Sequence, residues 1–136
     1  MLVYEGVKSG FINDVDLNLI TDKILTRFKE VFHRSTGESE INSWRESMLR
    51  MRGVLADNEI PNNAGVAIEF NIPHTSNRID FLLSGYDKNK KNSIIIIELK
   101  QWTHADAVPG KDGVVSTITG KALREVTHPS YQAWSY

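Results

Sequence analysis

The run of four isoleucines from Ile94 to Ile97 is the feature that most constrains the fold of this chain. Side chains alternate between the two faces of a β-strand, so a continuous apolar run places hydrophobic groups on both faces. We therefore expect Ser93–Trp102 to be a central strand that is covered on both sides. Because this strand ends in the charged residues Glu98 and Lys100, we expect its last residues to open into a crevice.

Two earlier segments, Val66–Ile72 and Arg78–Tyr86, are also rich in β-branched and aromatic residues. The stretches PHTSN and DKNKKN, which separate the three segments, have the composition of turns. The sequence therefore predicts a three-stranded antiparallel meander.

The segments on either side of the meander have other patterns. Apolar residues at three- and four-residue steps predict amphipathic helices over Asp14–Arg34 and Ile41–Leu55. After the meander, VVSTIT and ALREV predict a hairpin around Gly120 and Lys121, and Pro129 suits the first position of a final helix.

Symmetrical folding of the two hairpins aligns three acidic residues. Asp80 falls opposite Glu98 when the second turn is centred on Asn89, and Glu69 falls opposite Asp80 across PHTSN. Facing residues have Cβ atoms about 4.5–5.5 Å apart, and Lys100 projects from the same face about 7 Å further along the strand. The register also gathers apolar residues on the other face, which supports it: Ile68, Phe70, Ile72, Ile79, Phe81, Leu83, Ile95, Ile97 and Leu99.

Three neighbouring carboxylates repel one another, so the row needs a protonated carboxyl, a partner such as Lys100 or Arg78, or a bound cation. A divalent ion fits best, because Mg²⁺ takes one or two carboxylates, waters and phosphate oxygens as ligands. A lysine beside such an ion can orient a bound water or neutralise developing charge. The residues thus predict a site for Mg²⁺, at which the ion could polarise a phosphoryl group and lower the pKa of a bound water.

The same residues carry a resemblance to a known family. RID, followed by an apolar strand that ends in IELK, resembles the PD-(D/E)XK phosphodiesterase superfamily, in which Asp80 matches the Asp and Glu98 and Lys100 match the Glu-x-Lys. QAWSY is similar to the Gln-x-x-x-Tyr motif of the RecB-like branch, which Gln132 and Tyr136 match. A spacing of four residues puts these two on one helix face.

This resemblance implies an α/β fold with a restriction-endonuclease-like core, in which helices flank a mixed β-sheet with a central antiparallel meander. It implies a nuclease, with DNA favoured over RNA, in which Asp80, Glu98 and the Leu99 carbonyl hold the metal and Lys100 positions the attacking water. Gln132 and Tyr136 would complete the pocket.

Many members of the superfamily carry their first acid on the helix before the sheet, where the candidate here is Glu46. Glu46 falls opposite the apolar stripe of its helix, so we expect it to face solvent. Glu69 is the better first acid by geometry.

A closer similarity, over residues 1–136, is to the N-terminal nuclease-like region of large bacterial proteins with a helicase-type ATPase domain downstream. It implies one nuclease-like domain at the N-terminus of a longer protein. The chain length suits one domain. The chain has no cysteine, no signal peptide and no apolar run of about 20 residues, so we expect a soluble cytoplasmic protein without membrane contact.

The charge balance limits how the chain could bind nucleic acid. Sixteen Lys and Arg against seventeen Asp and Glu give a net charge of −1, so any phosphate-binding surface must be local. Lys88, Lys90 and Lys91 fit a solvated turn better than a phosphate contact. The four histidines have no zinc-site spacing.

Simpler interpretations remain open. The acids could form an ordinary ion-paired strand end, Glu69 could balance Arg78 at the surface, and Gln132 and Tyr136 could only pack. The function would then be an inactive nuclease-like module that binds nucleic acid, or a protein-interaction domain. The tryptophans are expected in the core (Trp44), beside the cleft (Trp102) and packed on the last helix (Trp134).

Overall fold

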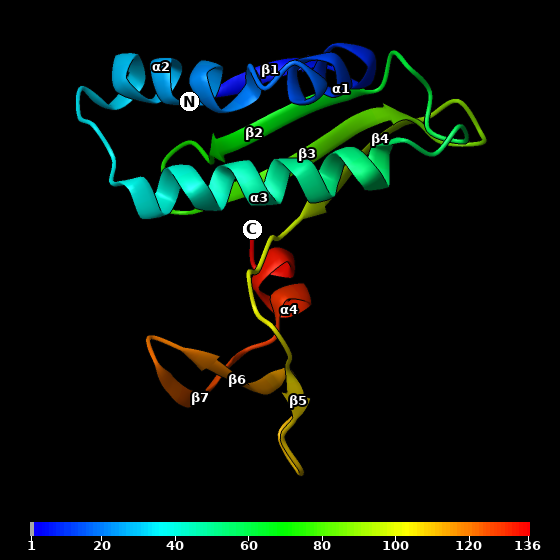
Figure 1. Cartoon of the computed structure of the whole chain (residues 1–136). Coiled ribbons are helices and arrows are strands. Elements are labelled where there is room, and N and C mark those ends of the chain that lie inside the picture. The colour runs from blue at the N-terminus through cyan, green and yellow to red at the C-terminus, as the bar shows by residue number, and fades with distance from the viewer. Residues whose placement is uncertain (1) are drawn as a thin grey trace.

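The chain forms a large and a small antiparallel sheet with four helices in the computed structural model, which describes residues 2–136. Figure 1 shows α1, α2 and α3 around the large sheet, with the small sheet set apart and α4 between them. The elements are β1 (Tyr4–Val7), α1 (Lys8–Asp16), α2 (Ile20–Phe32), α3 (Glu38–Leu55), β2 (Gly65–Asn71), β3 (Arg78–Tyr86), β4 (Asn92–Ile97), β5 (Asp106–Ala107), β6 (Val114–Thr119), β7 (Ala122–Thr127) and α4 (Pro129–Trp134).

The large sheet has the strand order β1-β2-β3-β4 and contains the predicted meander. Gly85 pairs with Ser93 and Phe81 with Ile97, so the next residues along each strand, Asp80 and Glu98, follow in the predicted register. Every strand pair in residues 2–136 is antiparallel. The architecture is therefore mixed α/β, but the expected mixture of parallel and antiparallel strands is not present in this part of the chain.

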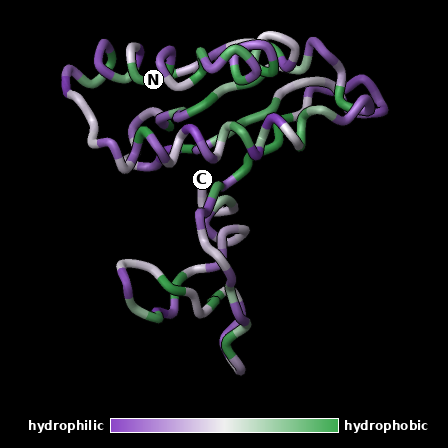
Figure 2. Tube along the Cα trace, viewed as in Figure 1, coloured by the Kyte–Doolittle hydropathy of each residue, from purple (hydrophilic) through white to green (hydrophobic). Residues whose placement is uncertain are grey.

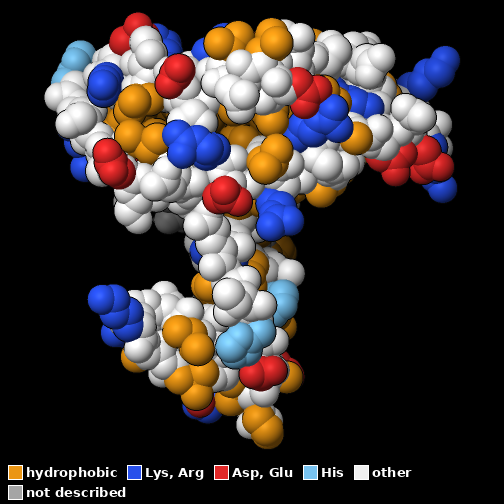
Figure 3. Space-filling model, in the orientation of Figure 1, with side chains coloured by type: hydrophobic (Ala, Val, Ile, Leu, Met, Phe, Trp, Pro, Cys, Tyr) orange, Lys and Arg blue, Asp and Glu red, His pale blue; other side chains and the backbone are white. Residues whose placement is uncertain are grey.

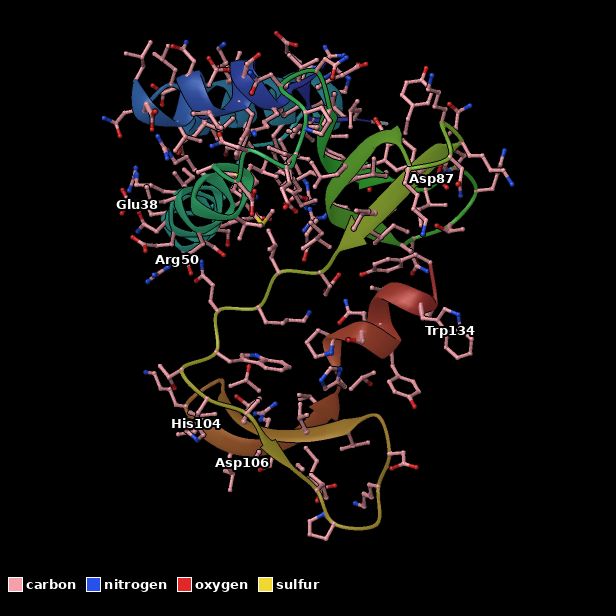
Figure 4. All side chains as sticks on the ribbon, turned by 90° about the vertical axis from the view of Figure 1, so that its right-hand side faces the viewer. Glu38, Arg50, Asp87, His104, Asp106 and Trp134 are labelled. Carbon is pink, nitrogen blue, oxygen red and sulfur yellow. The ribbon has the colours of Figure 1, made fainter. Side chains whose placement is uncertain are left out.

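The first three helices cover one face of the large sheet, as Figure 4 shows from the side. The predicted stripe of α3 is buried, including Trp44 and Met48. It packs with residues of the sheet such as Ile68 and Phe81 into one hydrophobic core. In Figure 2 the strands of the large sheet are strongly hydrophobic, whereas the helices alternate between hydrophobic and hydrophilic residues.

The helix predicted over Asp14–Arg34 is two helices, and the strand β1 before them was not predicted. The helices α1 and α2 are separated at Asn18, whose φ of 56° lies in the left-handed region. Asparagine enters that region more readily than most residues, so it ends α1 at low cost. Leu17 continues the apolar spacing across the break, although its side chain is exposed. The pattern alone therefore did not reveal that the helix ends there.

The isoleucine strand is an edge strand, which corrects the prediction that it is central. Within the described residues, β4 pairs only with β3, and the side chain of Ile94 is 65% exposed on the face without helices. Ile95 is also exposed, although it faces the helix side. Ile97 packs against the core. The apolar run therefore marks a strand of which only one end is covered.

The small sheet contains the predicted hairpin. Thr119 pairs with Ala122 across Gly120 and Lys121, which both have a positive φ, as a two-residue turn of the I′ type requires. Short β5 adds a third strand.

The helix α4 begins at Pro129, as predicted, and the Ser130 N–H donates to His128 Nδ1 at its N-terminus. Trp134 was expected to pack this helix but is 85% exposed, and its ring lies edge-on to that of Tyr131 on the same helix. No helix within residues 2–136 is long and apolar enough to cross a membrane.

Candidate functional site

A polar cleft of about 640 Å³ lies where β3, the end of β4 and α4 approach one another. The cleft brings together residues that are far apart in the sequence, because the small sheet occupies the chain between Lys100 and α4. Six residues that the sequence singled out line it: Asp80, Glu98, Leu99, Lys100, Gln132 and Tyr136.

Asp80 projects from β3 into this cleft. Its Oδ2 accepts a hydrogen bond from the Leu99 N–H at 2.9 Å, and Oδ1 has no hydrogen-bond partner within the described chain. The pKa of Asp80 is raised, and burial of the carboxyl is the largest cause. The hydrogen bond from the Leu99 N–H opposes this rise, whereas the nearby charge of Glu98 adds to it. The ionised form of Asp80 is thus under-compensated.

Glu98 follows the last residue of β4, and its side chain is only 3% exposed. Its Oε2 accepts from the Tyr136 hydroxyl at 2.7 Å, and its Oε1 accepts from Lys100 Nζ at 2.6 Å. Gln132 Nε2 donates in turn to the Tyr136 hydroxyl at 2.9 Å. The four residues form one hydrogen-bonded chain across the cleft.

Tyr136 is a fixed donor in this chain. Burial, together with its hydrogen bond to Glu98, raises the pKa of Tyr136 to about 12. The hydroxyl therefore stays protonated near neutral pH and holds the Glu98 carboxylate in one orientation.

Glu69 does not take the position predicted for it. Its φ of 56° is left-handed, and the β2–β3 ladder lacks the Glu69–Asp80 pair. The side chain is 7% exposed, accepts from Trp44 Nε1 at 2.9 Å, and places Oε2 2.5 Å from Arg78 Nε without hydrogen-bond geometry. Burial raises the pKa of Glu69 against the opposing effects of Arg78 and Trp44.

The expected row of three carboxylates is therefore not formed. Within residues 2–136, no three His, Cys, Asp or Glu side chains gather into a group that could hold a metal. The physical reason is the left-handed backbone at Glu69, whose carboxylate contacts Trp44 of α3 and Arg78 of β3 instead of Asp80.

Glu46 is exposed, as its helical position predicted. It borders a second hollow of about 420 Å³ together with Arg50, Lys100 and Trp102. Gln101 Nε2 donates to the Ser43 carbonyl of α3 at 2.9 Å, so the segment after Glu98 is tied to that helix. Leu99 and Lys100 therefore line both this hollow and the cleft that contains Asp80 and Glu98.

The donor set fits one hard divalent ion. Asp80 and Glu98 offer carboxylate oxygens and Leu99 offers a carbonyl, which suits Mg²⁺ or Mn²⁺ with waters and phosphate oxygens as further ligands. The free Oδ1 and the raised pKa of Asp80 point the same way, because a nearby cation would favour its ionised form. The cleft lining includes no histidine.

Sequence reasoning missed part of the cleft wall, namely Phe32, Arg34, Asn71, Ser76, Asn77 and Ser135. Arg34 follows His33, the C-cap residue of α2, and no spacing in the sequence relates it to Asp80. Only the packing of α2 beside the large sheet brings it to the cleft.

The fold and the cleft define a mixed α/β protein with two acids and a lysine in a polar cleft. Comparison of the chain with family models, curated proteins and solved structures found no match.

Proposed function

We propose that this protein is a metal-dependent nuclease that hydrolyses phosphodiester bonds of nucleic acid, with DNA as the favoured substrate. The observation that carries the proposal is the meeting of Asp80, Glu98 and Lys100 in one polar cleft. We further propose that the fold is a restriction-endonuclease-like core of the PD-(D/E)XK type. The antiparallel meander and its register support that assignment.

In this mechanism Asp80, Glu98 and the Leu99 carbonyl would hold Mg²⁺ or Mn²⁺. The bound ion would lower the pKa of a water and polarise the phosphoryl group. Lys100 Nζ, 2.6 Å from Glu98, supplies a positive charge and N–H donors beside the acids, where it can orient the water and stabilise charge on the phosphate.

The remaining residues of the site act through Glu98. The Tyr136 hydroxyl fixes one carboxylate oxygen, and Gln132 fixes the hydroxyl. These residues are positioning residues, because a carboxylate that is held in one orientation loses less freedom when it binds an ion.

A rival function is a nuclease-like module that binds nucleic acid without cutting it. The observation that favours it is that both Glu98 oxygens already have donors, Tyr136 and Lys100, from the same chain. Either function could operate beside a helicase-type ATPase domain in the cytoplasm, as the sequence resemblance implies.

The test is cleavage of single- and double-stranded DNA with Mg²⁺ or Mn²⁺ by wild type, Glu98→Ala and Lys100→Ala. We expect loss of about 10²-fold or more in each variant, because each removes a group that stabilises the transition state. Glu5→Ala, an exposed acid on β1, is the matched control. Equal cleavage by all four proteins would indicate a contaminant and remove the proposal. Mn²⁺ binding without any cleavage would favour the rival.

A further inference from the structure

Three cationic side chains line the described cleft, and two of them are already paired. Lys100 Nζ lies 2.6 Å from Glu98, and Arg78 lies 2.5 Å from Glu69 and 3.7 Å from Glu40. Arg34 is exposed, and no carboxylate within residues 2–136 lies within ion-pair distance of it. The cleft therefore has one cation whose charge its own chain leaves uncompensated.

Arg34 is nevertheless held in place by two aromatic rings. Its guanidinium carbon lies 5.7 Å from the ring centre of Phe28 and 5.9 Å from that of Phe32, and those two rings are 4.6 Å apart. Phe28 is buried in the core, so this cation–π contact anchors the side chain. The contact uses the face of the guanidinium and leaves its N–H donors available.

Arg34 and the acids reach the cleft from different elements. Glu98 follows the edge strand β4 and Asp80 lies on β3, whereas Arg34 follows α2, which contacts β1 on the other side of the sheet. Neighbouring strands are about 4.8 Å apart, so a cleft lined by the neighbouring ends of β2, β3 and β4 has room for more than one phosphate of a strand. Asn71 and Asn77 also line the cleft.

We propose that Arg34 forms a phosphate-binding subsite, which takes a backbone phosphate of the nucleic acid other than the one that is cleaved. Guanidinium groups bind phosphate through two parallel N–H donors, and an anchored, uncompensated one loses little freedom on binding. The substrate is then a strand with at least two phosphates, laid across the ends of β4, β3 and β2. This inference rests on the proposed function for what Asp80 and Glu98 bind.

The test compares Arg34→Gln, Arg34→Lys and a matched control, Arg27→Gln. Arg27 lies on α2, the helix that precedes Arg34, but it pairs with Glu30 and does not line the cleft. Binding of a labelled single-stranded oligodeoxynucleotide of about a dozen nucleotides is measured in EDTA over a range of salt concentrations. Hydrolysis with Mn²⁺ is measured on the same oligonucleotide and on bis(para-nitrophenyl) phosphate, which has one phosphate.

Arg34→Gln should weaken oligonucleotide binding about tenfold, as the loss of one charged contact does. It should also reduce the magnitude of the salt slope by about 0.7. Arg34→Lys should keep most of the affinity, and Arg27→Gln should match wild type. In hydrolysis, the loss in Arg34→Gln should be larger for the oligonucleotide than for the single-phosphate compound.

The inference is overturned if Arg34→Gln binds the oligonucleotide like wild type, or if Arg27→Gln weakens binding equally. Equal losses on both substrates would also overturn it, because they indicate a disturbed fold instead of a lost subsite. The proposed function fails separately, if wild type shows no metal-dependent hydrolysis that Glu98→Ala abolishes. The binding measurements in EDTA still decide the role of Arg34 in that case.

Discussion

At the scale of single residues, the buried acid Glu69 and the partly buried acid Asp80 differ in how their charge is compensated. Glu69 has an indole N–H donor and the guanidinium of Arg78 beside it. Asp80 has a backbone N–H on one oxygen, no partner on the other, and the charge of Glu98 nearby. A cation would therefore stabilise the ionised form of Asp80 more, which is why the proposed metal site is at Asp80 and not at Glu69.

The first prediction concerns Asp80→Asn, which removes this charge but keeps an oxygen to accept from Leu99. Because folding raises the pKa of Asp80, ionisation destabilises the folded state at pH 7, and the variant should melt a few degrees higher than wild type without metal. The difference should shrink as the pH falls from the raised pKa toward the ordinary Asp value, where the wild-type carboxyl is protonated in both states. Added Mn²⁺ should stabilise only the wild type.

Thermal unfolding with and without Mn²⁺ checks this prediction. Asp112→Asn, at an exposed acid in the turn between β5 and β6, is the control and should behave like wild type. A lower melting temperature for Asp80→Asn, or its stabilisation by Mn²⁺, would contradict the assignment.

The second prediction concerns Glu69. Glu69→Ala should cost about 1–3 kcal/mol of unfolding free energy, because it leaves Trp44 Nε1 buried without an acceptor and Arg78 without its closest partner. Glu69→Gln should cost less, since an amide oxygen can still accept from Trp44. Titration of Mn²⁺ into Glu69→Gln should give wild-type affinity. A weaker affinity would show that Glu69 belongs to the metal site after all.

At the scale of elements, the hydrophobic periods predicted α3, the meander, its register and the small hairpin, because each has one buried face and one short turn. They did not predict the break at Asn18 or the left-handed turn at Glu69, since both depend on single backbone angles. The isoleucine run was misjudged for another reason. Burial depends on what packs against a strand, and β4 has no neighbour on one side within the described residues.

The third prediction follows from that exposed edge. Ile94→Lys should change the unfolding free energy by less than about 0.5 kcal/mol, because the side chain is mostly in water already. It should also reduce self-association, since a charge on an edge strand opposes strand addition. Ile97→Lys, which places a charge against the core, should destabilise strongly. Sedimentation measures the self-association of the two variants, and chemical denaturation measures their unfolding free energy.

At the scale of the whole molecule, the cleft is assembled from the end of α2, the meander and α4. The approach of Asp80 and Glu98 could be predicted because the register of a single hairpin brings them together just beyond the Phe81–Ile97 pair. The approach of Gln132 and Tyr136 was expected only from the family resemblance, and Arg34 was not expected, because tertiary packing alone brings these residues to the cleft. Figure 3 shows Lys and Arg interspersed with Asp and Glu on the visible face, in agreement with a net charge of −1.

The fourth prediction concerns how α4 is held to the large sheet. Tyr136→Phe removes the donor to Glu98 Oε2, and a buried carboxylate oxygen without a donor costs about 1–3 kcal/mol. We expect faster amide exchange in α4 and weaker Mn²⁺ binding in this variant. Because the pKa of Tyr136 is about 12, wild type should show no loss of Mn²⁺ affinity from this hydroxyl between about pH 7 and pH 10. Unchanged exchange in α4 would mean that other contacts hold the helix.

The small sheet lies in the sequence between the two chain segments that complete the cleft, and the turn from β5 to β6 approaches α4 only at its last residue, Gly113, next to Tyr131. The protein has no cysteine, so Asp112→Cys in that turn would give a unique thiol. A fluorophore attached there would report, by quenching or energy transfer from a labelled oligonucleotide, when a strand arrives at the cleft, without blocking its path.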